Sequence, residues 1–322
     1  MKAKAPRNKT LELNTTQTNS YAAQAVKLKA NAELSEIQDR IIWQDALKAI
    51  DFLPEKSVDL MIVDPPYNLT KNFGKSTFKE RENSVYQQWF DEWLSKTVRL
   101  LKDNASIYIC ADWKTSIAIP EIAGKYFLLQ NRISWEREKG RGASNNWKNC
   151  LEDIWFFTKS KDYTFNLEAV KVQRRVIAPY RDKSGLPKDW VQNDDERYRL
   201  TAPSNIWTDI SIPFWSMPEN TPHPTQKPEK LIAKLILASS NPGDLVFDPF
   251  VGSGTTAVTA KKLGRHYVGI EREKEYVALA LKRLELAEEN REIQGYENGI
   301  FRARNGSNIF VKSLVFKKIH PK

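Results

Sequence analysis

The sequence predicts an α/β fold of the Rossmann-like kind, in which helices cover both faces of a mostly parallel sheet. Residues 58–63 form a short apolar, β-branched run that is typical of a buried strand. Residues 245–271 indicate a strand, a glycine-rich turn, a helix and a second strand that ends at Glu271. A glycine-rich turn after one strand and an acid at the end of the next are typical of the nucleoside-binding half of such a sheet.

The other elements follow from the same kinds of pattern along the chain. Apolar residues at helical spacing predict amphipathic helices, and short apolar runs between turn residues predict strands. The predicted strands are residues 40–44, 105–110, 127–135, 153–158 and 266–270. The predicted helices are residues 46–52, 86–101, a segment that begins near 229, and 274–289. Gly264 is placed to end the helix that follows the glycine-rich turn.

Composition narrows the class of protein. A chain of 322 residues is long enough for one large α/β domain with insertions, or for two domains. Its formal net charge of +10 favours a polyanionic partner. The two cysteines, Cys110 and Cys150, indicate no disulfide framework and fit a reducing compartment. We find neither a membrane-spanning apolar segment nor the apolar core of a secretory signal, so we expect a cytoplasmic protein.

The tetrapeptide Asp64-Pro65-Pro66-Tyr67 follows directly on the predicted strand 58–63. Each proline fixes its own φ, removes an N–H group and keeps the preceding residue extended, so the loop is stiff. It places a carboxylate and an aromatic ring at the carboxyl end of a strand, where open α/β sheets bind ligands. The alternative interpretation is a strand-ending turn with a capping aspartate.

The glycine-rich turn at residues 249–255 indicates the kind of cofactor. Its glycines allow the backbone to approach a ligand, and Glu271, about 20 residues beyond the turn, can bind ribose hydroxyls. The turn lacks the full G-x-G-x-x-G pattern of the dinucleotide binders. A nucleoside-containing cofactor without a pyrophosphate therefore fits better.

With D-P-P-Y at residues 64–67 and F-x-G-x-G at 250–254, the chain resembles the S-adenosylmethionine-dependent DNA amino-methyltransferases of the β arrangement, in which the first motif precedes the second. Residues 223–228 match the H-x-T-x-K-P signature of the same family. The resemblance covers residues 37–285. It implies a mixed, mostly parallel seven-stranded sheet, S-adenosylmethionine as the cofactor and double-stranded DNA as the substrate. The implied reaction is methylation of the N6 amine of a flipped adenine, as in restriction-modification systems.

The resemblance also implies the roles of individual residues. The Asp64 carboxylate and the Pro65 carbonyl would accept the hydrogens of the target amine, Tyr67 would stack on the flipped base, and Pro66 would help to keep the loop rigid. No metal is needed. The implied cofactor-binding residues are Asp45, Ala46, His223, Thr225, Lys227, Asp248, Phe250, Gly252, Ser253, Gly254, Thr255 and Glu271. Asp45 would bind the adenine amine of the cofactor, but it also fits a plain helix N-cap, and both roles can hold together.

The chain divides into five expected segments. They are a mobile N-terminal arm (1–36), a catalytic half (37–160), an irregular target-recognition insertion (161–220), a cofactor-binding half (221–290) and a basic C-terminal tail (291–322). Within the catalytic half, the long polar loop 68–83 is expected to close over the flipped nucleotide.

Candidate DNA contacts come from positively charged stretches with interleaved aromatic residues. The candidates are Arg141, Trp147, Arg174, Arg175, Arg181 and Lys183. Arginine can form bidentate bonds to guanine edges, which direct readout requires. The alternatives are a long hairpin loop with one anchoring aromatic around Trp147, and a surface insertion with solvated charges at 161–220.

Other functions stay open at this point. Methylation of the N4 amine of cytosine uses the same geometry. An RNA methyltransferase, or a DNA-binding protein that keeps a vestigial fold, is less favoured. A cognate restriction endonuclease and a homodimer are expected only from the resemblance.

Overall fold

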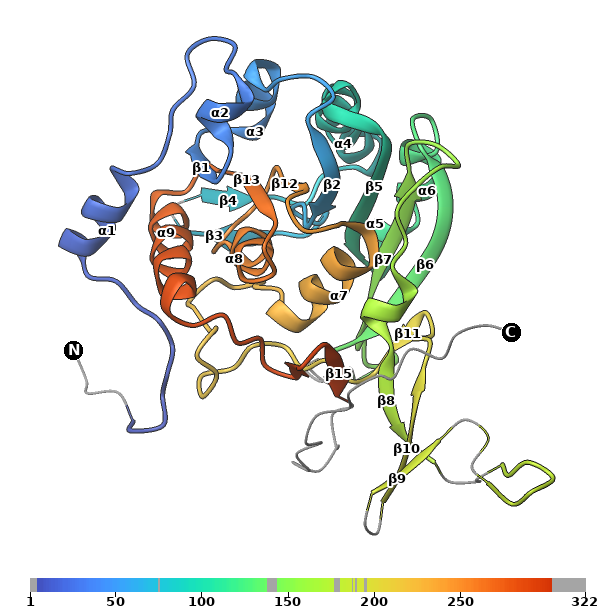
Figure 1. Cartoon of the computed structure of the whole chain (residues 1–322). Helices are drawn as coiled ribbons and strands as arrows, with labels where there is room; N and C mark the ends of the chain where they lie inside the picture. Colours follow the sequence, from blue (N-terminus) through green and yellow to red (C-terminus); the bar gives the residue numbers. More distant parts are fainter. Residues whose placement is uncertain are drawn as a thin grey trace.

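The computed structural model describes residues 5–302, except for 75, 138–143, 177–179, 187, 189 and 194–195. Within these residues, an eight-stranded sheet forms the centre of the protein (Figure 1), with the strand order β1-β13-β12-β2-β5-β7-β6-β11. Its strands are β1 (Arg40–Trp43), β2 (Val58–Val63), β5 (Leu101–Asp112), β6 (Leu128–Glu136), β7 (Leu151–Thr158), β11 (Ile206–Trp207), β12 (Leu245–Asp248) and β13 (His266–Glu271). A separate hairpin consists of β3 (Lys71–Phe73) and β4 (Ser76–Phe78).

The strand directions confirm a mixed, mostly parallel sheet. β1, β13, β12, β2 and β5 run parallel to one another, whereas β7 is antiparallel to both β5 and β6. We expected seven strands, and the sheet of the described residues has eight. The additional strand is β11, which pairs in parallel with the end of β6. A strand of two residues is too short to show alternation in the sequence.

Helices cover both faces of the sheet, as expected (Figure 1). The α-helices are α1 (Thr15–Ala22), α2 (Leu34–Ile37), α3 (Ala46–Ala49), α4 (Asn83–Thr97), α5 (Trp113–Ser116), α6 (Ile119–Ala123), α7 (Glu229–Ser239), α8 (Thr255–Lys262) and α9 (Lys274–Glu289). Short 3-10 turns are η1 (Ile50–Phe52), η2 (Val98–Leu100) and η3 (Leu167–Val170). Among the described residues, no helix combines the length and the apolar character needed to cross a membrane.

The two faces of β2 belong to two apolar cores. Met61 packs with residues of α3, α4 and α6, whereas Leu60 packs with residues of α7, α8 and α9. Successive side chains of a strand point to opposite faces, and both faces are covered here. This double burial is why β2 appears in the sequence as a continuous apolar run.

A second sheet occupies the predicted recognition insertion. Within the described residues its order is β14-β15-β8-β10-β9, formed by β8 (Val172–Arg175), β9 (Val191–Asn193), β10 (Glu196–Thr201), β14 (Tyr296–Glu297) and β15 (Ile300–Arg302). The insertion, expected to be irregular, thus contains three regular strands, β8, β9 and β10, in this sheet. β8, β10 and β9 form an antiparallel ribbon that extends away from the main sheet (Figure 1).

The start of the predicted C-terminal tail also belongs to this second sheet. β15 pairs in parallel with β8, and Phe301 is buried at the root of the ribbon with Val172. Residues 303–322 of the predicted tail lie outside the described residues.

The N-terminal segment is packed against the protein over residues 5–36. α1 lies along α9, and Ala22 is buried in the core that α9 shares. Val26 forms a parallel bridge to Ile42 of β1. The segment predicted as a mobile arm is therefore attached at α1 and at Val26, through apolar side chains that have no periodicity in the sequence and acquire partners only in the folded chain.

We predict that Ala22→Asp destabilises the protein by roughly 2–4 kcal/mol, because it buries a carboxylate without a partner. The matched control is Ala23→Asp, at an exposed neighbouring position, which should change stability by less than about 0.5 kcal/mol. Urea unfolding of both variants measures the difference. Equal midpoints would show that α1 is not docked.

Candidate active site

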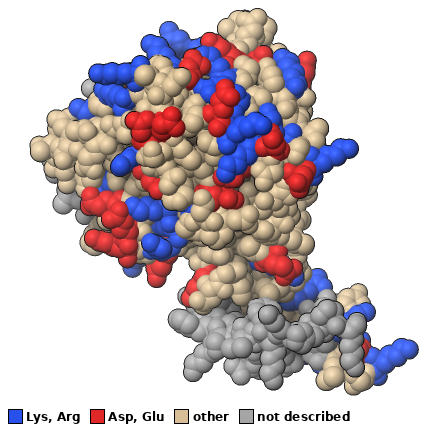
Figure 2. All heavy atoms as spheres, turned by 45° about the horizontal axis from the view of Figure 1, so that its top comes forward, with Lys and Arg blue, Asp and Glu red and all other residues tan. Residues whose placement is uncertain are grey.

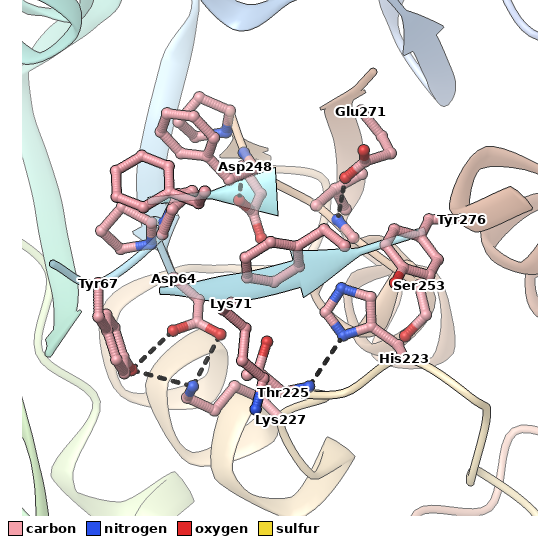
Figure 3. A pocket seen from close by; sticks show the side chains of 18 of the residues that line it. Asp64, Tyr67, Lys71, His223, Thr225, Lys227, Asp248, Ser253, Glu271 and Tyr276 are labelled. Atoms are coloured by element: carbon pink, nitrogen blue, oxygen red, sulfur yellow. Dashed lines mark hydrogen bonds and ion pairs between the residues drawn. The ribbon is translucent and has the colours of Figure 1, made fainter. Parts of the chain in front are cut away.

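A cavity of about 370 Å³ lies at the carboxyl ends of β1, β2, β12 and β13 (Figure 3). Because these strands are parallel, their ends meet at one edge of the sheet, where α/β folds bind ligands. Asp64, Pro65, Pro66 and Tyr67 all line the cavity. The cofactor-binding candidates that line it are Asp45, Ala46, His223, Thr225, Lys227, Asp248, Phe250, Gly252, Ser253, Thr255 and Glu271.

Gly254 is the predicted cofactor residue that does not line this cavity. Its φ is +89°, and an added Cβ would lie 2.7 Å from the Ala280 side chain. The glycine therefore allows α8 to begin close against α9, which is a packing role.

Polar side chains from four segments meet at Asp64, on what we call the catalytic side of the cavity; Figure 3 shows Asp64, Tyr67 and Lys227. Asp64 Oδ2 lies 2.7 Å from Lys227 Nζ, and Asp64 Oδ1 accepts a 2.8 Å hydrogen bond from the Tyr67 hydroxyl. Glu152 Oε2 lies 3.2 Å from both Lys227 Nζ and Tyr67 Oη. Arg137 pairs with the other oxygen of Glu152. The D-P-P-Y loop is thus held by groups from β7, from the end of β6 and from the segment before α7.

Sequence reasoning missed Glu152 and Arg137. β7 is antiparallel to β5, so its amino end carries Glu152 to the edge of the sheet where the loop after β2 begins. The one available signal was an acid directly before an apolar strand. An apolar run does not reveal the direction of its strand, so this signal could not be placed.

The electrostatics of the cluster keep its protons in place. Burial raises the pKa of Tyr67 well above its usual value, and the charges of Asp64 and Glu152 raise it further. Burial lowers the pKa of Lys227, but Asp64 and Glu152 outweigh burial and raise this pKa overall. At neutral pH the loop therefore contacts a protonated phenol and an ammonium ion.

The glycine-rich turn and Glu271 meet on the cofactor side. Gly252 has a φ of +53°, and its N–H donates to Glu271 Oε2 at 3.1 Å. A Cβ at residue 252 would lie 2.9 Å from His223 Nε2, so this close approach requires glycine. Glu271 Oε1 accepts the N–H of Glu273 at 2.7 Å. Each carboxylate oxygen keeps a second acceptor site, which fits a ribose hydroxyl.

Two acids of the cofactor side titrate near neutral pH. Burial raises the pKa of Glu271 to about 7 and that of Asp248 also to about 7. Asp248 accepts hydrogen bonds from the Thr256 hydroxyl at 2.6 Å and from the Phe250 N–H at 3.0 Å. These bonds fix the start of the turn.

His223 is neutral in this site. Burial lowers its pKa to about 3, and the charges of Lys227 and Arg283 act in the same direction. Its Nδ1 accepts the Thr225 N–H at 3.4 Å, and its ring packs edge-on against Tyr276 with 4.4 Å between centroids. His223 therefore presents a neutral ring to the glycine-rich turn.

Asp45 is the N-cap of α3, as predicted, since its side chain accepts the Leu47 N–H at 3.1 Å. It also lines the cavity. The capping role and a ligand-facing position thus coexist.

The β3–β4 hairpin lies over the cofactor side. The Gly74 N–H donates to the Tyr276 hydroxyl at 2.9 Å, and the Ser76 hydroxyl bonds to Glu273. The Phe73 ring lies 6.1 Å from the His223 ring. We expected loop 68–83 to close over a flipped nucleotide, but these contacts place its hairpin beside the cofactor residues instead.

The predicted DNA contacts that the structure describes lie outside the cavity. Those that the structure describes are exposed: Trp147, Arg174, Arg175, Arg181 and Lys183. Arg141 lies outside the described residues. The face in Figure 2 carries Lys and Arg side chains interspersed with Asp and Glu, so its charge is mixed.

This fold and this cavity define a Rossmann-like enzyme with a nucleoside site beside an acidic, proline-fixed loop. Comparison with known proteins identifies the family. The DNA methylase family of N6 and N4 methyltransferases matches residues 58–282. The chain belongs to this family.

Relatives and solved structures agree with this family. M.HpaI, a type II methyltransferase of Haemophilus parainfluenzae, is 38% identical over 254 residues, which cover 77% of this chain and 75% of the relative. The DNA adenine methyltransferase YhdJ of Escherichia coli (strain K12) is 36% identical, over 77% of this chain and 83% of its own. The crystal structure of M1.HpyAVI aligns with a TM-score of 0.50 at 25% identity, over 76% of this chain and 97% of its own. The cytosine-N4-specific PvuII DNA methyltransferase shares the fold, with a TM-score of 0.57 at 20% identity over 81% of this chain and 88% of its own.

We predict that Glu271→Gln becomes more stable relative to the unaltered protein as the pH rises from 5 to 8. The folded protein holds the Glu271 proton up to a pKa of about 7, whereas an unfolded glutamate titrates near 4.3. As the pH rises between these two pKa values, the unaltered protein therefore loses stability, whereas the Glu271→Gln variant, which has no proton to release at this position, does not. Urea unfolding at both pH values measures the difference. Parallel pH curves would contradict a raised pKa at Glu271.

Proposed function

We propose that the protein is a site-specific DNA methyltransferase that transfers the methyl group of S-adenosylmethionine to the N6 amine of an adenine flipped out of duplex DNA. The observation that carries the proposal is the single cavity that holds the Asp64 loop beside the turn around Gly252. Membership of the DNA methylase family supports the reaction. The relative YhdJ, a DNA adenine methyltransferase, supports adenine as the target.

The cofactor side of the cavity fits a nucleoside. Glu271 would bind the ribose hydroxyls and Asp45 the adenine amine, while the turn at 250–253 would pass close to the methionine end, beside His223 and Thr225. S-adenosylmethionine would supply an electrophilic methyl group bonded to a positively charged sulfur. The acids on this side suit a cationic group.

The catalytic side of the cavity suits the activation of an amine. The exocyclic amine of adenine is a poor nucleophile, because its lone pair is delocalised into the ring. The Asp64 carboxylate and the Pro65 carbonyl would accept its two hydrogens and localise the lone pair on nitrogen. The prolines and the partners of Asp64 hold these acceptors in place before the substrate arrives, which is the preorganisation that lowers the barrier.

The transfer balances as one bond formed and one broken. The amine lone pair would form the C–N bond as the bond from the methyl carbon to the cofactor sulfur breaks, and the electrons of that bond would stay on sulfur. Asp64 would then take one proton from the nitrogen and release it to water. Alignment of the amine with the methyl group supplies the remaining rate enhancement.

Tyr67 would stack on the flipped base. Extrusion of a base costs a few kcal/mol, which stacking and hydrogen bonds in the pocket return. Pro66 keeps the tyrosine next to the acid.

We assign target recognition to residues 161–220, with the exposed arginines of the β8–β10–β9 ribbon as base or phosphate contacts. The resemblance adds Arg141 and Trp147, in the loop between β6 and β7, as contacts near the flipped base. A cognate restriction endonuclease and a second copy of the chain are the partners that the resemblance implies. A DNA substrate and the low cysteine content support a cytoplasmic location.

We predict that DNA incubated with the protein and S-adenosylmethionine gains N6-methyladenine, as read by nucleoside mass spectrometry. Asp64→Ala should reduce the product at least about a thousandfold, since it removes both an amine acceptor and the proton acceptor. Cofactor binding by calorimetry should largely survive. N4-methylcytosine would overturn the adenine target, and a cofactor-bound protein without any methylated DNA base would overturn the function.

We predict that Arg174→Ala and Arg175→Ala each raise the KM for DNA roughly tenfold and leave cofactor affinity unchanged. Loss of a phosphate contact should lower the salt slope of DNA binding by about 1, whereas loss of a base contact should relax the target sequence. The control is Lys56→Ala, which removes an exposed lysine paired with Asp103 before the amino end of β2. Unchanged DNA binding by both arginine variants would show that β8 is not part of the DNA interface.

A further inference from the structure

Lys227 belongs to the H-x-T-x-K-P segment that the resemblance assigns to the cofactor, yet its ammonium group lies on the catalytic side. Its Nζ is 2.7 Å from Asp64 Oδ2, 3.1 Å from Tyr67 Oη and 3.2 Å from Glu152 Oε2. An ammonium group has three hydrogens and no acceptor. These three acceptors can take all three hydrogens, so none remains for the carboxylate of a cofactor.

Glu152 connects the members of this cluster. Its Oε2 faces both Lys227 and Tyr67, and its Oε1 pairs with Arg137. The side chain is 4% exposed. Both oxygens thus have partners inside the protein, and no part of the carboxylate depends on water.

The charges of the cluster balance. Two carboxylates, Asp64 and Glu152, face two cations, Lys227 and Arg137. A buried charge is tolerated only when it is paired, and removal of one partner leaves a costly unpaired charge. Lys227 therefore cannot leave Asp64 for a cofactor contact without leaving two carboxylates less well paired.

The consequence is a catalytic carboxylate that is fixed in place. The Tyr67 hydroxyl holds one oxygen of Asp64 at 2.8 Å, and Lys227 holds the other at 2.7 Å. A carboxylate has about four acceptor sites, so one can still take a hydrogen of the target amine. The plane of the carboxylate is set before that amine arrives.

We propose that Lys227 and Glu152 are positioning residues for methyl transfer, which together fix the Asp64 carboxylate and the Tyr67 hydroxyl, and that Lys227 does not bind the cofactor. The inference rests on the proposed function, because it assigns the two residues to that reaction. It moves Lys227 from the cofactor set to the catalytic set and adds Glu152.

Lys227→Met and Glu152→Gln test the proposal in the full chain. The kcat at saturating DNA and cofactor should fall about a hundredfold in each variant, as expected for a small misplacement of a reacting group. The Kd for S-adenosylmethionine by calorimetry should change less than about threefold. A cofactor-binding lysine gives the reverse: a Kd weakened more than tenfold with kcat retained, which would overturn the proposal.

The double variant Glu152→Gln with Lys227→Met keeps the charges of the cluster balanced, so it remains informative if a single variant fails to fold. Residues that act as one unit have non-additive effects. The double variant should therefore lose no more activity than the worse single variant. Two results would show that Lys227 and Glu152 do not act together. One is a folded double variant with the kcat of the unaltered protein, and the other is a loss of kcat equal to the product of the two single-variant losses.

Asp59→Asn is the matched control. Asp59 is the second residue of β2, so it lies at the end of the strand that is farther from the catalytic loop 64–67. Its Oδ1 lies 2.7 Å from Lys102 Nζ. Its loss should lower the melting temperature and leave kcat unchanged. A fall in kcat as large as that of Glu152→Gln would show a general effect of weakening the sheet and overturn the proposal. Absence of DNA methylation by the unaltered protein would instead refute the proposed function itself.

Discussion

The ion pair between Lys227 and Asp64 joins the two halves of the catalytic domain. Residues 37–160 and 221–290 each supply strands to one sheet, and this pair connects the loop after β2 to the segment that leads into α7. Because both charged groups are largely buried, each depends on the other. The parallel strands bring their carboxyl ends to one edge, and the ion pair fixes how the two loops at that edge face each other. The Asp64 loop and the glycine-rich turn acquire a defined separation in this way.

Much of the fold could be predicted from local patterns. β2 and α9 match the predicted residues 58–63 and 274–289, because each buries a continuous run or a regular stripe of apolar side chains. The recognition ribbon could not be predicted, since β8 has one buried residue, Val172, followed by the exposed pair Arg174 and Arg175, and so shows no alternation in the sequence. The attachment of α1 has no signal in the sequence for a related reason: Ala22 is buried only because α9 is beside it.

The parts of the candidate site that could be predicted from the sequence are those formed by short motifs of consecutive residues. The D-P-P-Y loop, the glycine-rich turn and Glu271 stand directly after strands, so the sheet itself brings them together. Glu152 is the second residue of β7, and only the antiparallel direction of this strand carries it to the same edge. Gly254 shows that a glycine of a ligand-binding signature can serve helix packing, because its lack of a Cβ lets α8 begin against Ala280 of α9.

The pairing of β15 with β8 limits how this enzyme can be engineered. The ribbon is completed at its root by a strand that comes from beyond α9, and Lys230 Nζ donates to the Arg302 carbonyl at 2.6 Å. Residues 161–220 are therefore not a self-contained module. A chimera that exchanges this stretch alone between relatives would receive a ribbon without its edge strand, so residues 296–302 would have to be transplanted with it.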